Sequence, residues 1–105
     1  LAAATVELLR RGRADLADRA GLYHLSAQGA ATWYEFARAI LADTNVRLTP
    51  IATTDYPTPA RRPAYGVLDS SRFARTFGLA LPDWRSMLDE CLRAPAEPPA
   101  GFPVN

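Results

Sequence analysis

Three prolines in the middle of the chain, Pro57, Pro59 and Pro63, limit the folds open to it more than any other feature of the sequence. Proline fixes φ and pushes the residue before it toward extended geometry. The run YPTPARRP, residues 56–63, is therefore predicted to be a stiff and largely pre-shaped loop. Such a loop holds its side chains in place at a lower entropy cost than a flexible one.

The loop carries two adjacent arginines, Arg61 and Arg62, with Tyr56 before them and Tyr65 after them. A guanidinium group is a planar fork of donors that suits phosphate or carboxylate oxygens. The formal net charge of the chain is only +1, so we predict no nucleic-acid partner, and any anion must be bound locally. The loop predicts anion recognition by Arg61 and Arg62, with Tyr56 and Tyr65 as aromatic walls. The alternative is a surface loop whose arginines are solvated or paired with Asp69.

The N-terminal part of the chain predicts a helix, a connection and a strand. Leucines recur at helical spacing over residues 1–9, and Gly12 then supplies a stop. Residues 10–21 are interpreted as a charged connection. The segment GLYHLS, residues 21–26, is short, apolar and aromatic, which is typical of a buried strand.

The next helix has the clearest signature in the sequence. Thr32 and Glu35 have the spacing of a capping box. A stripe of apolar residues follows at helical spacing and consists of Trp33, Phe36, Ala37, Ile40 and Leu41. We predict that Trp33 and Phe36 lie in the core and do not stack on a ligand.

A second strand and a short helix are predicted on either side of the proline loop. The strand covers residues 46–54, and Pro50 places it at a sheet edge or a bulge. After the loop, Asp69 or Ser70 caps a short helix that Gly78 ends in the left-handed conformation.

The last helix opens at Pro82 or Asp83 and carries an apolar stripe. The stripe consists of Trp84, Met87, Leu88, Cys91 and Leu92. Cys91 is therefore predicted to be a buried, inert thiol. We expect one domain over residues 1–94, followed by a flexible proline-rich tail over residues 95–105.

These elements define a small α/β unit with helices packed on about two short strands. Two strands are too few to cover the helices, so such a unit would pack on a larger sheet that is absent from this sequence. The chain begins with Leu1 in a helical pattern, and we expect it to be a piece of a longer protein. No apolar run approaches the roughly 18 residues of a membrane helix, so no membrane partner is predicted.

The sequence contains no recognisable catalytic set. It has no lysine and only scattered glycines, which excludes a P-loop, a dinucleotide fingerprint and a Tyr/Lys proton-transfer pair. His24 and Cys91 are the only residues of their types, which excludes a Cys/His zinc site, and His24 is expected to be a satisfied structural residue. We expect no catalytic, cofactor-binding or metal-binding residue here, and no activity from this chain alone.

Three blocks resemble the C-terminal part of the dTDP-4-dehydrorhamnose reductase family. They read GLYHLSAQGAATWYEFARAI, YPTPARRPAYGVLDSSRF and FGLALPDWRSMLDECL, and the resemblance covers about residues 1–93. Four family motifs lie in them in order: G-x-Y-H-L-S, W-Y-E-F-A, R-P-x-x-S-x-L-D and L-P-x-W. Gly66 stands where the family has serine, so no role is carried over to this position.

The resemblance implies an extended short-chain dehydrogenase/reductase that reduces dTDP-4-dehydro-L-rhamnose to dTDP-L-rhamnose with NADPH or NADH, in the cytoplasm. In this family a Rossmann-like N-terminal domain holds the cofactor and the Tyr/Lys pair, and a smaller C-terminal domain binds substrate. The implied partners of this chain are therefore a dTDP-sugar and that N-terminal domain. The diphosphate of the dTDP-sugar is the implied anion for Arg61 or Arg62.

Some members of the family are metal-linked dimers, which implies Mg²⁺ and a homodimer, although no carboxylate of this sequence matches such a metal site. Two competing interpretations remain at this point. The fold also resembles the regulatory subunit of methionine adenosyltransferase, a binding protein without rhamnose chemistry. The other interpretation is an α/β module whose proline loop binds nothing.

Overall fold

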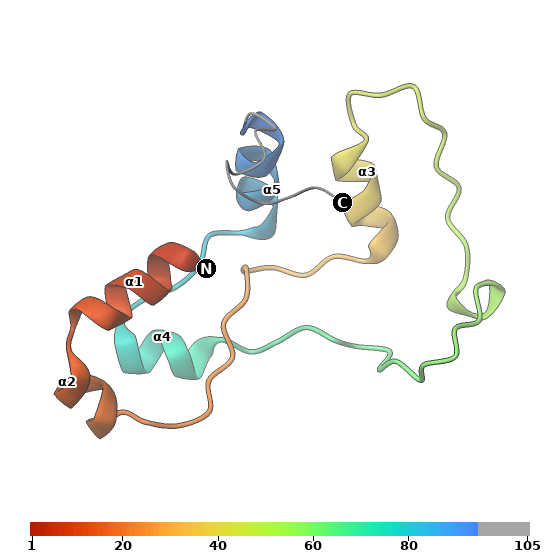
Figure 1. Ribbon diagram of the computed structural model, residues 1–105. Helices are drawn as coiled ribbons and strands as arrows, with labels where there is room; N and C mark the ends of the chain where they lie inside the picture. The colour runs from red at the N-terminus through yellow and green to blue at the C-terminus, as the bar shows by residue number, and fades with distance from the viewer. Residues whose placement is uncertain (95–105) are drawn as a thin grey trace, which may run out of the picture.

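The computed structural model describes residues 1–94, and this part of the chain is built from short helices and long connections (Figure 1). In chain order the elements are α1 (Ala2–Arg10), α2 (Arg13–Asp18), α3 (Trp33–Ile40), the 3-10 helix η1 (Thr53–Asp55), α4 (Ser71–Phe77) and α5 (Trp84–Arg93). A long arm leaves α3, passes through η1 and returns to α4 (Figure 1). The predicted tail, residues 95–105, lies outside the described residues.

The two predicted strands are not formed within residues 1–94. Residues 21–26 run without regular structure, and residues 46–54 are irregular until η1 begins at Thr53. The one β-type contact in this part of the chain is an isolated parallel bridge between Gln28 and Asp83. A strand needs a partner for its backbone groups, and the described residues offer none to either segment. The prediction of helices is therefore confirmed, whereas their packing on two strands is not.

Helix α2 lies where the sequence predicted only a charged connection, so that interpretation of residues 10–21 was wrong. Helix α1 ends at Arg10 with Arg11 as its C-cap, just before the predicted stop at Gly12, and Gly12, with φ of 90°, is the N-cap of α2. An ion pair one helical turn apart, from Asp15 to Arg19 at 3.0 Å, accompanies the new helix. The charges that were interpreted as a solvated connection therefore line a helix.

The core is formed where Tyr23 meets α4. Phe73 and Phe77 are the two buried apolar side chains of residues 1–94, and the Tyr23 ring packs edge-on against them at 6.2 and 5.1 Å between centroids. The guanidinium of Arg72 lies over the Tyr23 ring, 4.8 Å from its centroid. Gly78, with φ of 65°, ends α4 in the predicted left-handed conformation.

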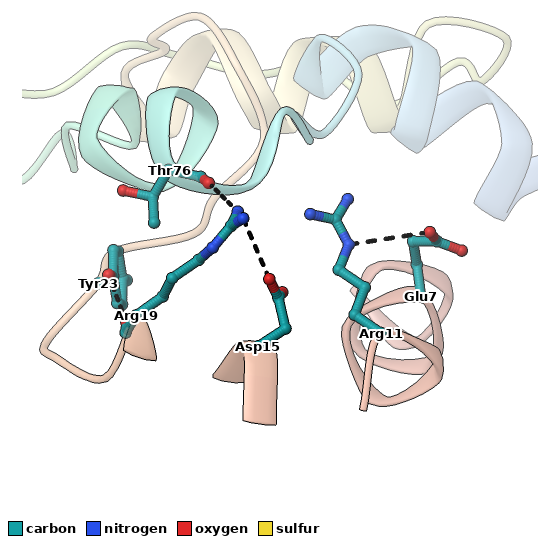
Figure 2. A network of polar contacts seen from close by, with 6 residues as sticks. All are labelled: Glu7, Arg11, Asp15, Arg19, Tyr23 and Thr76. Carbon is teal, nitrogen blue, oxygen red and sulfur yellow. Dashed lines mark hydrogen bonds and ion pairs between the residues drawn. The ribbon is translucent and has the colours of Figure 1, made fainter. Parts of the chain in front are cut away.

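Polar contacts hold α2 against this core (Figure 2). Arg19 donates to the backbone oxygen of Thr76 at 2.8 Å, and its own backbone oxygen accepts from the Tyr23 hydroxyl at 2.6 Å. On α1, Arg11 and Glu7 form a looser pair at 3.9 Å. Because Arg19 follows α2 directly, its hydrogen bond to the Thr76 oxygen ties the end of α2 to α4.

Helices α3 and α5 pack on each other through Phe36 and Trp84, whose ring centroids are 5.7 Å apart. The predicted capping box of α3 is confirmed, with Thr32 Oγ1 accepting from the Glu35 amide at 3.1 Å and Glu35 Oε2 accepting from the Thr32 amide at 2.7 Å. The core prediction is wrong for Trp33, which is 85% exposed. The buried thiol was also wrong, since Cys91 is exposed. Two short helices shield only the parts of their stripes that face each other.

The described chain is more open than a domain of its length. Its radius of gyration is 18.0 Å, whereas about 13 Å is typical for a compact domain of this size. Large apolar side chains remain in solvent, among them Leu22 at 78% and Ile51 at 64% exposure. Both residues belong to the segments for which strands were predicted. The segments without a strand partner in residues 1–94 are therefore also segments with exposed apolar side chains.

Candidate functional site

The proline loop is a solvent-exposed excursion of the chain. Residues 56–68 are exposed throughout, and within them the one hydrogen bond joins the Thr58 hydroxyl to the Ala60 oxygen at 3.1 Å. The turn before the loop is closed locally, because Asp55 Oδ2 accepts from the Ala52 amide at 3.1 Å. The loop is therefore shaped by its own residues.

The two arginines of the loop are exposed and have no polar partner among the residues that the structure describes. Within residues 1–94, Arg61 and Arg62 take part in no hydrogen bond or ion pair. Pairing with Asp69, the alternative left open by the sequence, is not present. Asp69 Oδ1 accepts instead from the Ser71 amide at 2.9 Å, and this backbone hydrogen bond lowers the pKa of the Asp69 carboxyl.

The two tyrosines of the predicted site differ in their position relative to a groove on the surface. Both are exposed, Tyr56 at 70% and Tyr65 at 77%. Tyr65 borders an open groove of about 530 Å³, and Tyr56, Arg61 and Arg62 do not. The structure therefore brings Tyr65 to a concave surface and leaves the other three predicted residues on the outer part of the loop.

The groove lies between the segment after Tyr23 and the end of the loop. Its walls are residues 26–30 on one side, residues 65 and 67–71 on the other, with Ala74, Ala80 and Leu81 closing it. Two serine hydroxyls meet there, since Ser26 Oγ and Ser70 Oγ are 3.3 Å apart. Sequence reasoning missed these serines because the contact joins residues 44 positions apart.

A backbone clamp fixes one wall of this groove to the start of α5. The Gln28 amide donates to the Pro82 oxygen and the Trp84 amide donates to the Gln28 oxygen, both at 3.0 Å. The Gln28 side chain adds a third hydrogen bond to the Leu81 oxygen at 2.8 Å. At Gly29, with φ of 83°, a Cβ atom would stand 2.7 Å from Asp83 Oδ1, so glycine is required for this close approach.

Other functional groups are sparse in the described part of the chain. No cluster of three or more His, Cys, Asp or Glu residues that could hold a metal ion occurs within residues 1–94. His24 is exposed and lies outside the buried core of residues 1–94, and its expected structural role stays a prediction. None of the helices in residues 1–94 has the length and apolarity needed to cross a membrane.

The described residues thus form an exposed loop that carries two arginines, and a separate open groove that Tyr65 borders. Comparison with protein families makes the assignment specific. Residues 1–96 match the family model described as the RmlD substrate binding domain, and the chain belongs to this family.

Similar curated proteins carry a consistent name. A dTDP-4-dehydrorhamnose reductase of Burkholderia thailandensis is 40% identical over 93 residues, which cover 79% of this chain and 31% of that protein. The reductase of the same name in Escherichia coli K12 is 43% identical over 76 residues, covering 65% of this chain and 25% of the relative. A spore coat polysaccharide biosynthesis protein of Bacillus subtilis, SpsK, is 37% identical over 75 residues, covering 70% and 26%.

The chain thus spans about a quarter to a third of the length of these relatives. No solved structure matches it.

Proposed function

We propose that this chain is the substrate-binding part of a dTDP-4-dehydrorhamnose reductase, which reduces dTDP-4-dehydro-L-rhamnose to dTDP-L-rhamnose with NADPH or NADH. The observation that carries the proposal is the family match over residues 1–96, together with reductases about 40% identical. The same relatives favour a reductase over the regulatory subunit of methionine adenosyltransferase, the alternative that the sequence left open.

Within this function, Arg61 and Arg62 bind the diphosphate of the dTDP-sugar. Their support is physical: both guanidinium groups are exposed, have no partner within residues 1–94, and stand on a loop that three prolines stiffen. Tyr65, at the edge of the groove, and Tyr56, at the start of the loop, are the aromatic walls of the site. An anion bound there needs no rearrangement of an existing ion pair.

We assign the reduction step to the part of the reductase that lies outside this chain. A Rossmann domain there would hold the nicotinamide cofactor and the proton-transfer pair, and it would act in the cytoplasm. We further propose that residues 21–26 and 46–54 become strands of a sheet that this remaining length completes. Their exposed apolar residues, Leu22 and Ile51, support this pairing. A homodimer and an Mg²⁺ site remain predictions drawn from the resemblance alone.

The test is the affinity for dTDP of a complete reductase that carries this chain, with Arg62→Ala and Arg61→Ala compared to the parent. Loss of a charge-assisted hydrogen bond costs about 1.5–3 kcal/mol, so the affected variant should bind dTDP about 10- to 150-fold more weakly. Affinity for the nicotinamide cofactor should stay unchanged.

Arg47→Ala is the matched control, because Arg47 is an exposed arginine outside the loop with no ion pair in the described residues. Parent-like dTDP affinity in both loop variants would show that the arginines are not the diphosphate site.

A further inference from the structure

Helix α1 leaves apolar side chains in solvent, while an ion pair takes up part of its inner side. Figure 2 shows Glu7 and Arg11 on the side of α1 that faces α4, and the half-buried Leu8 completes that side. The side chain of Arg11 is 26% exposed, whereas Leu9 is 67% and Val6 47% exposed. A helix on the surface of a complete domain turns its apolar stripe toward the core. The outward side of α1 therefore has the composition of a face that is normally covered.

The exposed apolar residues of α1 share one side of the helix, which we call the outer face of α1. This face consists of Ala2, Thr5, Val6 and Leu9, which have the spacing i, i+3, i+4, i+7 and are all exposed. Its one polar side chain, Thr5, donates its hydroxyl to the Leu1 oxygen within the helix at 3.2 Å. Single exposed apolar residues are ordinary on a protein surface. A contiguous face whose hydroxyl is already bonded is instead suited to close contact with another apolar surface.

The remaining length of the reductase is the occupant of this face that the observations favour. The match covers 31% of the Burkholderia thailandensis relative, so more than two thirds of that protein lies outside it. In the proposed function, this remaining length holds the cofactor, and the substrate-binding part must lie against it for the substrate to reach the cofactor. Ligand sites are common at such interfaces between two parts of a protein. At least one face of the described chain is then covered by the rest of the reductase.

We propose that the outer face of α1 is the surface through which this chain docks on the rest of the reductase; this inference rests on the proposed function. Arg10, one helical turn after Val6 at the edge of the face, is exposed and forms no ion pair within residues 1–94. The complementary surface is therefore apolar at its centre and carries an acidic group opposite Arg10. Docking through a helix face leaves the proline loop accessible to the dTDP-sugar.

The test is thiol labelling of the complete reductase that carries this chain, with Cys91→Ser removing the exposed native thiol of this part. Leu9→Cys tests the outer face, and Asp18→Cys, at an exposed position of α2, is the matched control. Iodoacetamide labelling of each peptide is followed by mass spectrometry. We expect Leu9→Cys to react at least about 10-fold more slowly than Asp18→Cys, because a covered thiol reacts only when the interface opens. In denaturant the two variants should react at the same rate.

Val6→Cys lies on the same face, should be protected in the same way, and replaces Leu9→Cys if that variant does not fold. Equal labelling of the outer face and the control would overturn the inference. Protection that disappears on dilution would also overturn it, because a second copy of the chain would then be the occupant. Protection that is independent of protein concentration supports docking within one chain.

Thermal unfolding of the complete reductase provides a second readout. Leu9→Gln keeps a good helix former, so it should be nearly neutral on a solvent-exposed face. On a covered face it should lower Tm by at least about 2 °C, whereas Asp18→Gln should melt as the parent does. An unchanged Tm in Leu9→Gln would contradict the docking. Neither measurement involves dTDP, so the docking of α1 and the diphosphate site at Arg61 and Arg62 can fail independently of each other.

Discussion

At the scale of single residues, two neighbouring polar side chains before α4 make different hydrogen bonds. Asp69 caps α4 while Ser70 reaches across to Ser26, although both residues have the chemistry of an N-cap. The sequence narrowed the cap to these two residues and could not choose between them. The choice depends on where the Ser26 amide lies, which is a property of the folded chain.

Gly29 offers the sharpest test at this scale. Gly29→Ala should destabilise the protein by about 1–3 kcal/mol, because alanine is strained at a positive φ and its Cβ would stand 2.7 Å from Asp83 Oδ1. Asp83 also caps α5 by accepting from the Arg85 amide at 2.9 Å, so its displacement would weaken that helix as well. The measurement is the free energy of unfolding of a complete reductase carrying the change.

Gly66→Ala is the matched control for Gly29, since a Cβ atom at Gly66 would meet no other atom within 4 Å and the φ of this residue is not positive. It should leave the free energy of unfolding nearly unchanged. Equal effects from the two substitutions would show that the close approach at Gly29 has no energetic weight.

At the scale of elements, helix ends are decided by short-range chemistry. The capping box of α3 predicts that Thr32→Ala lowers the free energy of unfolding by about 1 kcal/mol, because the Glu35 amide loses its acceptor. Binding of dTDP should be unaffected. Thr54→Ala, at an exposed threonine of η1 whose side chain makes no hydrogen bond within residues 1–94, serves as the control in the same denaturation series. Identical curves for both variants would contradict the role of the box.

The same box predicts a pH dependence. Hydrogen bonding from the Thr32 amide, followed by the Thr32 hydroxyl, lowers the pKa of Glu35 from 4.5. Since the folded pKa lies below the unfolded one, the stabilisation is fully present above about pH 4.5 and is lost as the pH falls through the folded pKa. The difference in stability between the parent and Glu35→Gln should therefore shrink between pH 7 and pH 3.

Glu90→Gln, at an exposed position of α5 without an ion pair in the described residues, is the reference for this titration. A constant difference between the parent and Glu35→Gln at all pH values would mean that the carboxylate charge contributes nothing to the cap.

At the scale of the whole molecule, residues 1–94 bury too little apolar surface to form a compact unit. Only Phe73 and Phe77 are buried among the apolar residues of this part of the chain, and the radius of gyration is 18.0 Å. We predict that small-angle scattering of the chain by itself gives a radius of gyration of at least about 18 Å. A value near 13 Å, typical of a compact domain of this length, would contradict this openness.

Features that depend on residues a few positions apart could be predicted without the structure. The capping box at Thr32 and the left-handed Gly78 were both predicted, because each follows from local geometry. The family assignment also followed from contiguous motifs. The Asp15–Arg19 ion pair at the end of α2 is also a local contact, and the sequence interpretation placed both residues in a connection.

Only the tertiary structure decided which predicted faces are covered. Trp33 and Cys91 lie on apolar stripes, yet both are exposed, because a stripe is buried only where another element reaches it. The predicted strands at residues 21–26 and 46–54 lack pairing partners within residues 1–94 for the same reason. The Ser26–Ser70 contact depends on long-range placement as well. Periodicity specifies which side of an element is apolar, whereas burial and pairing need a second surface, and its position is set by the rest of the fold.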